Sequence, residues 1–349
     1  MNTQDSISDK RRLTECDDSG IDAVTRDTDV WLPDGNIVVI ARNTGFRVHK
    51  SILAIHSEVF RDLFLLPPSA AEEETLDGCP VVWVSDDPTH LRRLFLVLCC
   101  GKKCVIHFIG VRRFTNICSY YYENDELIPV QFDVLYSLIN MGHKYAIPSI
   151  LNDALSRLKK YYPSDLSAWE NYPQRARYVT IRPPDFLLAV QVARLTNTFS
   201  ILPSAYLEMS RHAEQLVMML PEFHDGQLGL TAEIITQALR GKAALIEGVT
   251  SRILAISTAV PAPQCPTQSQ CALLAHGLLG RLNVSGEIET KLSCEVALQP
   301  LYDWFWGVAA NALCACCQEA SRRVDEEMRQ RVWKTLPQHF RLEVDGWPV

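Results

Sequence analysis

The 349-residue sequence has few features of membrane or nucleic-acid-binding proteins. A membrane-spanning helix requires about 20 consecutive apolar residues, and no apolar run in this sequence is nearly that long, so we expect no membrane contact. Basic residues number 34 against 41 acidic ones, and they form no basic patch. Because binding to nucleic acid depends on many Lys and Arg contacts to phosphate, we expect no direct nucleic-acid partner. The polar first 25 residues lack the apolar segment of an export signal, which predicts a disordered tail and an intracellular protein of the cytoplasm or nucleus.

Sequence motifs of the common enzyme classes are also missing. There is no G-x-S-x-G nucleophile turn, no H-E-x-x-H zinc motif, no P-loop and no G-x-G-x-x-G turn. His107, His143 and His276 are isolated histidines, for which a place in the core or on the surface is the common outcome. We therefore expect no catalytic residues and no enzyme activity.

Cysteine, in contrast, is present at 12 positions, and five of these lie near one another in two late segments. In an intracellular protein the cysteines are expected to be thiols. Cys314 and Cys317 have C-x2-C spacing, and Cys265 and Cys271 are separated by five residues. Four thiolates form the closed tetrahedral site typical of structural zinc, so Cys265, Cys271, Cys314 and Cys317 are candidate ligands. The alternative is a group of free thiols without a cofactor.

The most informative part of the chain is the segment from residue 29 to residue 64. Apolar residues at 30–32 and 37–40 flank Asp34 and Gly35, which predicts a β-hairpin with a tight turn. Two short helices should follow, joined at Ser57, whose hydroxyl can cap the second helix.

Further helices are predicted from the spacing of apolar residues. Pro88 suits the first position of a helix whose apolar stripe is Leu91, Leu94, Phe95 and Leu98. Such a stripe is more typical of core than of a docking face. Additional helices are expected from about residue 132 and near residue 148. We interpret 163–184 as a linker and 185–349 as a mainly helical region.

The segments DVWLPDGNIVV, FRVHKSILAIHSEVFRDLF, LDGCPVVWVSDDP, MGHKYAIPSILNDALSRL and ILPSAYLEMSRH resemble a known family as a set. They are similar to BTB (POZ) domain proteins of the type abundant in mushroom-forming (basidiomycete) fungi. The resemblance implies an α+β fold with a small sheet and surrounding helices over 26–162, followed by the helical region.

The resemblance also implies particular roles for residues and partners. In BTB domains the positions of Asp29 and His49 lie close together near the pocket where two chains dimerise, and the position of Lys50 is often arginine. We expect Asp29 and His49 to be buried and hydrogen-bonded to each other. The helix with Leu91, Leu94, Phe95 and Leu98 would be the docking helix for a partner such as a cullin-type scaffold.

One segment departs from the family pattern. The family's usual Tyr-Thr-Gly-like turn is replaced by Cys99-Cys100-Gly101, and an insertion follows at about 101–128. Two interpretations remain for Cys104–Ser119: a genuine surface insertion, or translation of a retained intron.

The function that the resemblance implies is that of an interaction protein. We expect an adaptor that self-associates as a homodimer through its BTB domain, with substrate recruitment to a cullin-type ubiquitin ligase as one such role. The alternative is a transcription or chromatin factor that acts through partners, since the chain shows no DNA-binding module of its own.

Overall fold

The computed structural model describes residues 21–65, 74–99, 129–218 and 225–348, which form two compact units. The first unit extends to Leu155 and the second begins at Ser156, within one helix. The expected tail up to residue 20 and the whole of the expected insertion, including Cys104–Ser119, lie outside the described residues. Among the described helices, none combines the length and apolar character needed to cross a bilayer.

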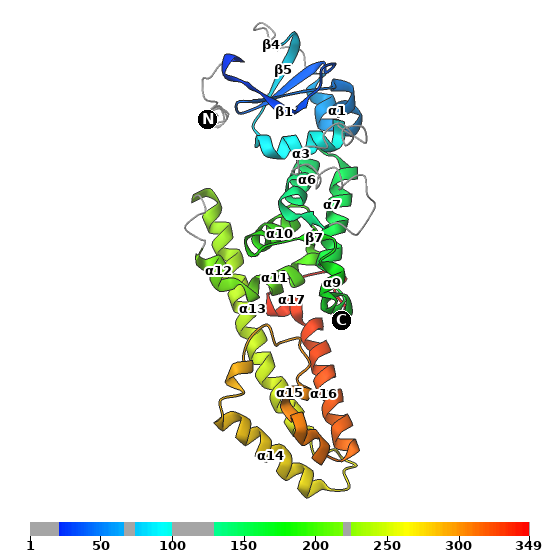
Figure 1. Ribbon diagram of the computed structural model, residues 1–349, viewed down its shortest axis with the longest axis vertical. Coiled ribbons are helices and arrows are strands. Elements are labelled where there is room, and N and C mark those ends of the chain that lie inside the picture. Colours follow the sequence, from blue (N-terminus) through cyan, green and yellow to red (C-terminus); the bar gives the residue numbers. More distant parts are fainter. Residues whose placement is uncertain (1–20, 66–73, 100–128, 219–224, 349) are drawn as a thin grey trace, which may run out of the picture. The chain divides into compact units, whose positions relative to one another are not determined.

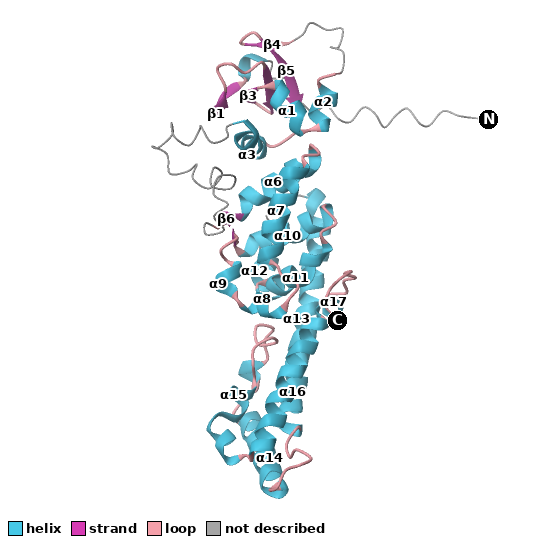
Figure 2. Ribbon diagram, turned by 90° about the vertical axis from the view of Figure 1, so that its right-hand side faces the viewer, coloured by secondary structure: helices cyan, strands magenta, loops and turns pink. Residues whose placement is uncertain are grey.

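The first unit is built on a five-stranded sheet (Figures 1 and 2). Its strands are β1 (Thr25–Trp31), β2 (Ile37–Ala41), β3 (Thr44–Val48), β4 (Thr75–Leu76) and β5 (Cys79–Val84). Their order in the sheet is β1-β3-β2-β5-β4. The β2–β3 and β4–β5 pairs are antiparallel, whereas β1–β3 and β2–β5 are parallel. The expected α+β fold is therefore confirmed.

The predicted hairpin at Asp34 and Gly35 was wrong. β1 does not pair with β2; both strands pair with β3, and the hairpin is β2–β3, which turns through Arg42 at a φ of 52°. Glycine is needed at position 35 because the Arg47 side chain packs closely against its backbone. A Cβ atom there would lie 2.9 Å from Cγ of Arg47, whose Nε donates a hydrogen bond to the Gly35 carbonyl oxygen at 2.8 Å. Asp-Gly indicates a local turn, but the strands' pairing partners are set by packing over the whole sheet.

Helices complete the core of the first unit. They are α1 (Lys50–His56), α2 (Glu58–Leu63), α3 (Pro88–Cys99), α6 (Phe132–Lys144) and the first part of α7 (Pro148–Tyr161), with the short strand β6 (Val130–Gln131) before α6. The predicted cap at Ser57 is present: its hydroxyl accepts from the Phe60 amide at 3.1 Å and donates to the Tyr145 carbonyl at 2.5 Å. The Phe60 ring stacks on the Tyr145 ring with centroids 4.3 Å apart. One serine thus starts α2 and ties it to the end of α6.

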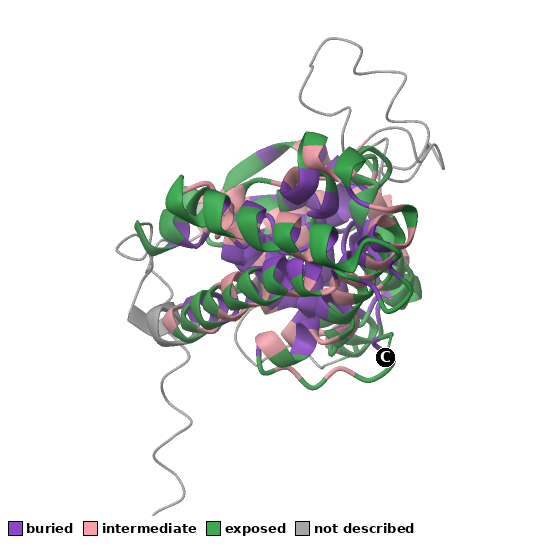
Figure 3. Ribbon diagram, turned by 90° about the horizontal axis from the view of Figure 1, so that it is seen from below, coloured by how far each residue is buried: buried purple, intermediate pink, exposed green. Residues whose placement is uncertain are grey.

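The second unit is mainly helical. After the rest of α7 come α8 (Leu166–Glu170), α9 (Tyr172–Arg175), β7 (Val179–Thr180), α10 (Pro183–Leu195), η2 (Phe199–Ile201), α11 (Leu202–Arg211), α12 (Ala213–Met218) and α13 (Asp225–Thr258). The chain continues through α14 (Gln268–Val284), η4 (Glu289–Lys291), α15 (Tyr302–Trp306), η5 (Gly307–Ala312), α16 (Ala315–Lys334) and α17 (Leu336–His339). Buried residues lie on the sides of these helices that face one another, and exposed residues lie on the outer sides (Figure 3).

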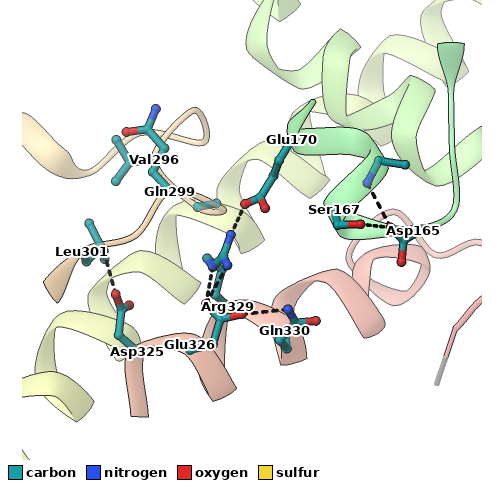
Figure 4. A network of polar contacts seen from close by, with 12 residues as sticks. Asp165, Ser167, Glu170, Val296, Gln299, Leu301, Asp325, Glu326, Arg329 and Gln330 are labelled. Carbon is teal, nitrogen blue, oxygen red and sulfur yellow. Dashed lines mark hydrogen bonds and ion pairs between the residues drawn. The ribbon is translucent and has the colours of Figure 1, made fainter. Parts of the chain in front are cut away.

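The segment expected to be a linker, 163–184, is instead part of this packed unit. Trp169 of α8 and Val179 of β7 are buried, and the Trp169 ring lies 5.8 Å from that of Trp333 on α16. Arg329 of α16 also bonds Glu170 and Glu326 (Figure 4). The proline-rich composition suggested a loop, but the Trp169 side chain in it is buried against α16.

A buried ion pair holds the long helices of this unit. Arg252 on α13 and Asp325 on α16 are both buried, and Nη2 of Arg252 lies 2.6 Å from Oδ1 of Asp325. The other carboxylate oxygen accepts from the backbone amides of Leu301 and Tyr302 at 2.7 and 2.9 Å. Figure 4 shows the contact between Asp325 and Leu301. The connection before α15 is thereby fixed to α16.

Candidate functional site

Asp29, His49 and Lys50 lie on the first unit, where the sequence placed the dimer pocket. Asp29 is partly exposed and its Oδ2 is 3.7 Å from Nε of Arg92, whereas Nε2 of His49 is 3.3 Å from Oδ1 of Asp34. Within the described part of the chain, no hydrogen bond joins Asp29 to His49. The expectation that these two bond each other is thus not met, because each has a different partner.

The buried acid of β1 is Asp27, which the sequence reasoning missed. Its side chain binds Arg92 at 2.6 Å and accepts from the amides of Asp29 and Val30, each at 2.9 Å. The pairing of β1 with β3 is irregular between Arg26 and Trp31, so alternation of side chains is interrupted there. Burial, followed by the nearby Asp27 charge, raises the pKa of Asp29. No sequence signal marks this bulge, and the two acids could not be told apart.

Helix α3 presents its apolar stripe to the core, as its spacing favoured. Leu91, Leu94 and Phe95 are inaccessible to solvent and Leu98 is half-buried. The Phe95 ring meets the Phe46 ring edge-on at 5.5 Å. Because these three side chains are buried in the core, they are not available to dock a partner as expected. A partner that binds α3 would contact other residues of this helix.

The acids before α3 have separate tasks. Asp87 caps the helix by accepting from the Thr89 amide at 2.8 Å. Asp86 is not part of the cap: it is buried, and it accepts from Nζ of Lys144 at 2.6 Å and from the hydroxyl of Tyr145. Burial and this carboxylate together raise the pKa of Tyr145, which keeps its proton as a hydrogen-bond donor.

Exposed apolar side chains lie on the α1–α2 pair. Ile55, at the end of α1, is 79% exposed, and Val59 of α2 is 40% exposed. Lys50 at the start of α1 is exposed, with its Nζ 5.2 Å from the centre of the Phe64 ring. Sequence patterns do not distinguish Ile55 from its buried neighbour Leu53, because α1 is too short for a clear helical period.

In the second unit, five cysteines from three segments come together. Cys265 lies in the connection between α13 and α14, Cys271 in the first turn of α14, Cys314 at the N-cap of α16, and Cys316 and Cys317 in the first turn of α16. Cys265, Cys271 and Cys317 are buried, whereas Cys314 and Cys316 are partly exposed. Four of these five residues, all except Cys316, are the candidate ligands that the sequence indicated.

The sulfur atoms are spaced as metal ligands are. The Sγ atom of Cys314 is 3.5 Å from that of Cys265, 3.9 Å from that of Cys271 and 3.2 Å from that of Cys316. A zinc ion with four sulfurs at about 2.3 Å has ligand atoms about 3.8 Å apart. Four sulfurs, those of Cys265, Cys314, Cys316 and Cys317, lie within 4.8 Å of one another and could hold a metal ion. This group contains Cys316 in place of the expected Cys271.

The surroundings favour a thiolate at Cys314. The hydrogen bond from Cys316 is the largest influence and, with the Cys317 amide, lowers the pKa of Cys314 to about 6. The same contact raises the pKa of Cys316, and burial raises the pKa of Cys317. The backbone amide of Ala262 donates to the Cys317 sulfur at 3.3 Å. Helix N-termini and amide donors of this kind stabilise anionic sulfur.

The second unit also contains a pocket of about 480 Å³, in which two arginines are paired with Glu208. Arg175 lies 4.0 Å from the centre of the Trp169 ring and binds Glu208 at 2.7 Å. Arg211 lies 3.6 Å from the other oxygen of Glu208. This arrangement resembles a structural ion pair and offers no nucleophile beside a base.

Comparison with protein families identifies one domain. Residues 34–82 match the family described as BTB/POZ domain. Comparisons with curated proteins and with solved structures gave no match. The matched residues run from the turn before β2 to the middle of β5 and include β3, α1 and α2. A BTB/POZ domain is therefore found at residues 34–82 of the first unit, and domains of this family in general mediate protein–protein interaction.

Proposed function

We propose that this protein is an adaptor that self-associates through its BTB domain. The observation that carries the proposal is the match of the sheet and the α1–α2 pair to a protein-interaction domain. The exposed apolar side chains of Ile55 and Val59 support it, since apolar residues that are rimmed by polar ones often mark contacts between proteins. Asp29, His49 and Lys50 would border the contact between two chains.

Self-association can be tested with the full-length chain. We expect sedimentation velocity to show a dimer at micromolar concentration. Lys50→Glu and Ile55→Glu should each weaken the dimer about tenfold or more, which corresponds to about 1.4 kcal/mol, because each places a carboxylate in the contact. Lys159→Glu makes the same charge change as Lys50→Glu, but at an exposed position of α7, and it should leave the dimer unchanged. A wild-type chain that stays monomeric, or a dimer that is indifferent to both substitutions, would contradict the proposal.

Recruitment to a cullin-type ubiquitin ligase is the specific adaptor role that we propose. Because three of the four apolar stripe residues of α3 are buried, the scaffold would meet the exposed side of this helix, which includes Thr89. A pull-down with the amino-terminal region of a cullin should retain the full-length chain and lose the Thr89→Arg variant. Without a retained complex, self-association alone remains. A transcriptional role through partners would begin with the same self-association, and no described contact favours it.

For the cysteine cluster we propose a structural zinc ion. The donor set supports this role: four thiolates suit zinc, and a closed tetrahedral site leaves no position for a substrate. Such a site would stabilise the end of the second unit and would take no part in catalysis.

A further inference from the structure

We propose that the metal site has five thiols for four coordination positions. Cys265, Cys314 and Cys317 would be permanent ligands, and Cys271 and Cys316 would be alternative fourth ligands. This inference rests on the proposal that the cluster binds zinc.

The three permanent ligands are those that both candidate sets share. Cys265 and Cys317 have sulfur atoms within 4.8 Å of each other and of Cys314, and both are buried. Cys314, at the N-cap of α16, also contacts each of the two alternatives, so it lies at the centre of the cluster. The four sulfurs that lie within 4.8 Å of one another thus include all three, and Cys271, which is outside that group, reaches it through Cys314.

The two alternatives approach Cys314 from different helices. Cys316 is on α16 itself, with its sulfur 3.2 Å from that of Cys314, and its other contact is a long one to the Gln264 carbonyl at 3.5 Å. Cys271 is on α14, with its sulfur 3.9 Å from that of Cys314 and 3.3 Å from the Thr267 hydroxyl. Neither sulfur has a partner strong enough to hold it away from a metal ion.

The choice of the fourth ligand decides what the metal holds. With Cys316 the ion joins α16 to the preceding connection at Cys265; with Cys271 it also joins α14. Helix α14 buries only Cys271, Ala275, Leu278 and Leu282 of its 17 residues, so its attachment depends on few contacts. Exchange of Cys271 for Cys316 would release the start of α14 without loss of the metal.

Serine substitutions in the full-length protein test this redundancy. Zinc affinity would be measured by competition with a chromophoric chelator, and metal content by elemental analysis. We expect Cys271→Ser and Cys316→Ser each to retain one zinc ion, and the double variant to bind at least about 100-fold more weakly, a loss that exceeds the effect of changing a residue outside the first coordination shell. Cys294→Ser, a buried thiol outside the cluster, is the matched control.

The outcomes separate the two proposals. Wild-type protein without zinc would overturn the zinc site itself. Wild-type protein with zinc would overturn the redundancy if one single variant lost as much affinity as the double, or if the double bound like wild type. Circular dichroism would verify that each variant is folded.

The rate of cysteine alkylation gives a second test that does not require a measurement of zinc affinity. Cys316 is partly exposed, so iodoacetamide should modify it more slowly with zinc than after chelation. In Cys271→Ser, where Cys316 must be the fourth ligand, we expect it to be protected further. An equal alkylation rate of Cys316 in wild type and in Cys271→Ser would overturn the inference.

Discussion

At the scale of single residues, the buried pair Arg252–Asp325 holds together parts of the helical unit that are far apart in the chain. Arg252 donates to the carbonyl oxygens of Ala297 and Gln299 at 2.6 and 2.8 Å, as well as to Asp325. Asp325 in turn satisfies two backbone amides before α15. Removing one member of such a pair leaves a buried charge without compensation, which costs more than the pair contributes.

We expect Asp325→Ala to lower the free energy of unfolding by about 3–5 kcal/mol, because Arg252 would stay charged and buried. The double variant with Arg252→Met should lose less than the sum of the two single changes. Arg323→Ala removes an exposed i,i+4 contact to Glu327 on the same helix and should change stability by about 0.5 kcal/mol or less. Urea unfolding measures all four; additive losses in the double variant would contradict this account.

At the scale of elements, glycines within helices show how much packing decides. Gly241 of α13 faces the Phe340 ring, and a Cβ there would lie only 1.9 Å from Cε1 of that ring. Gly277 of α14 is exposed, and an added Cβ would have no neighbour within 4 Å. Sequence propensity treats both as weak helix positions.

Alanine at these two positions should therefore have opposite effects. Gly277→Ala should stabilise by about 0.5–1 kcal/mol through helix propensity. Gly241→Ala should destabilise by about 1–3 kcal/mol, because Phe340, which is fully buried against Tyr206, must move. Thermal unfolding of the pair is the measurement, and stabilisation by both changes would show that α13 and Phe340 are not in close contact.

At the scale of the whole molecule, each unit has its own interior. Leu138 of α6 lies in the first and Leu245 of α13 in the second, and both are almost completely buried. Units with separate cores can open separately, and substitutions in them act independently.

Matched substitutions can test this independence by native-state hydrogen exchange. Leu138→Ala should remove about 2–5 kcal/mol of stability and speed amide exchange in the sheet and α6, with α13 and α16 unaffected. Leu245→Ala should give the reverse pattern. Faster exchange in both units from either change would instead indicate one cooperative structure.

The sequence alone determined the elements that depend on near neighbours. The Ser57 cap, the Asp87 cap and the inward stripe of α3 each follow from residues within one or two turns. The gathering of the cysteines was foreseen from their chemistry, and the BTB domain from a set of short segments.

Only the tertiary structure decided which partners these elements have. It placed β3 between β1 and β2, exchanged Asp29 for Asp27 as the buried acid, and included Cys316 in the group of four close thiols. These outcomes depend on contacts between residues far apart in the chain. Local turn, capping and periodicity signals are equally compatible with several such pairings, and the packing of the complete core selects one.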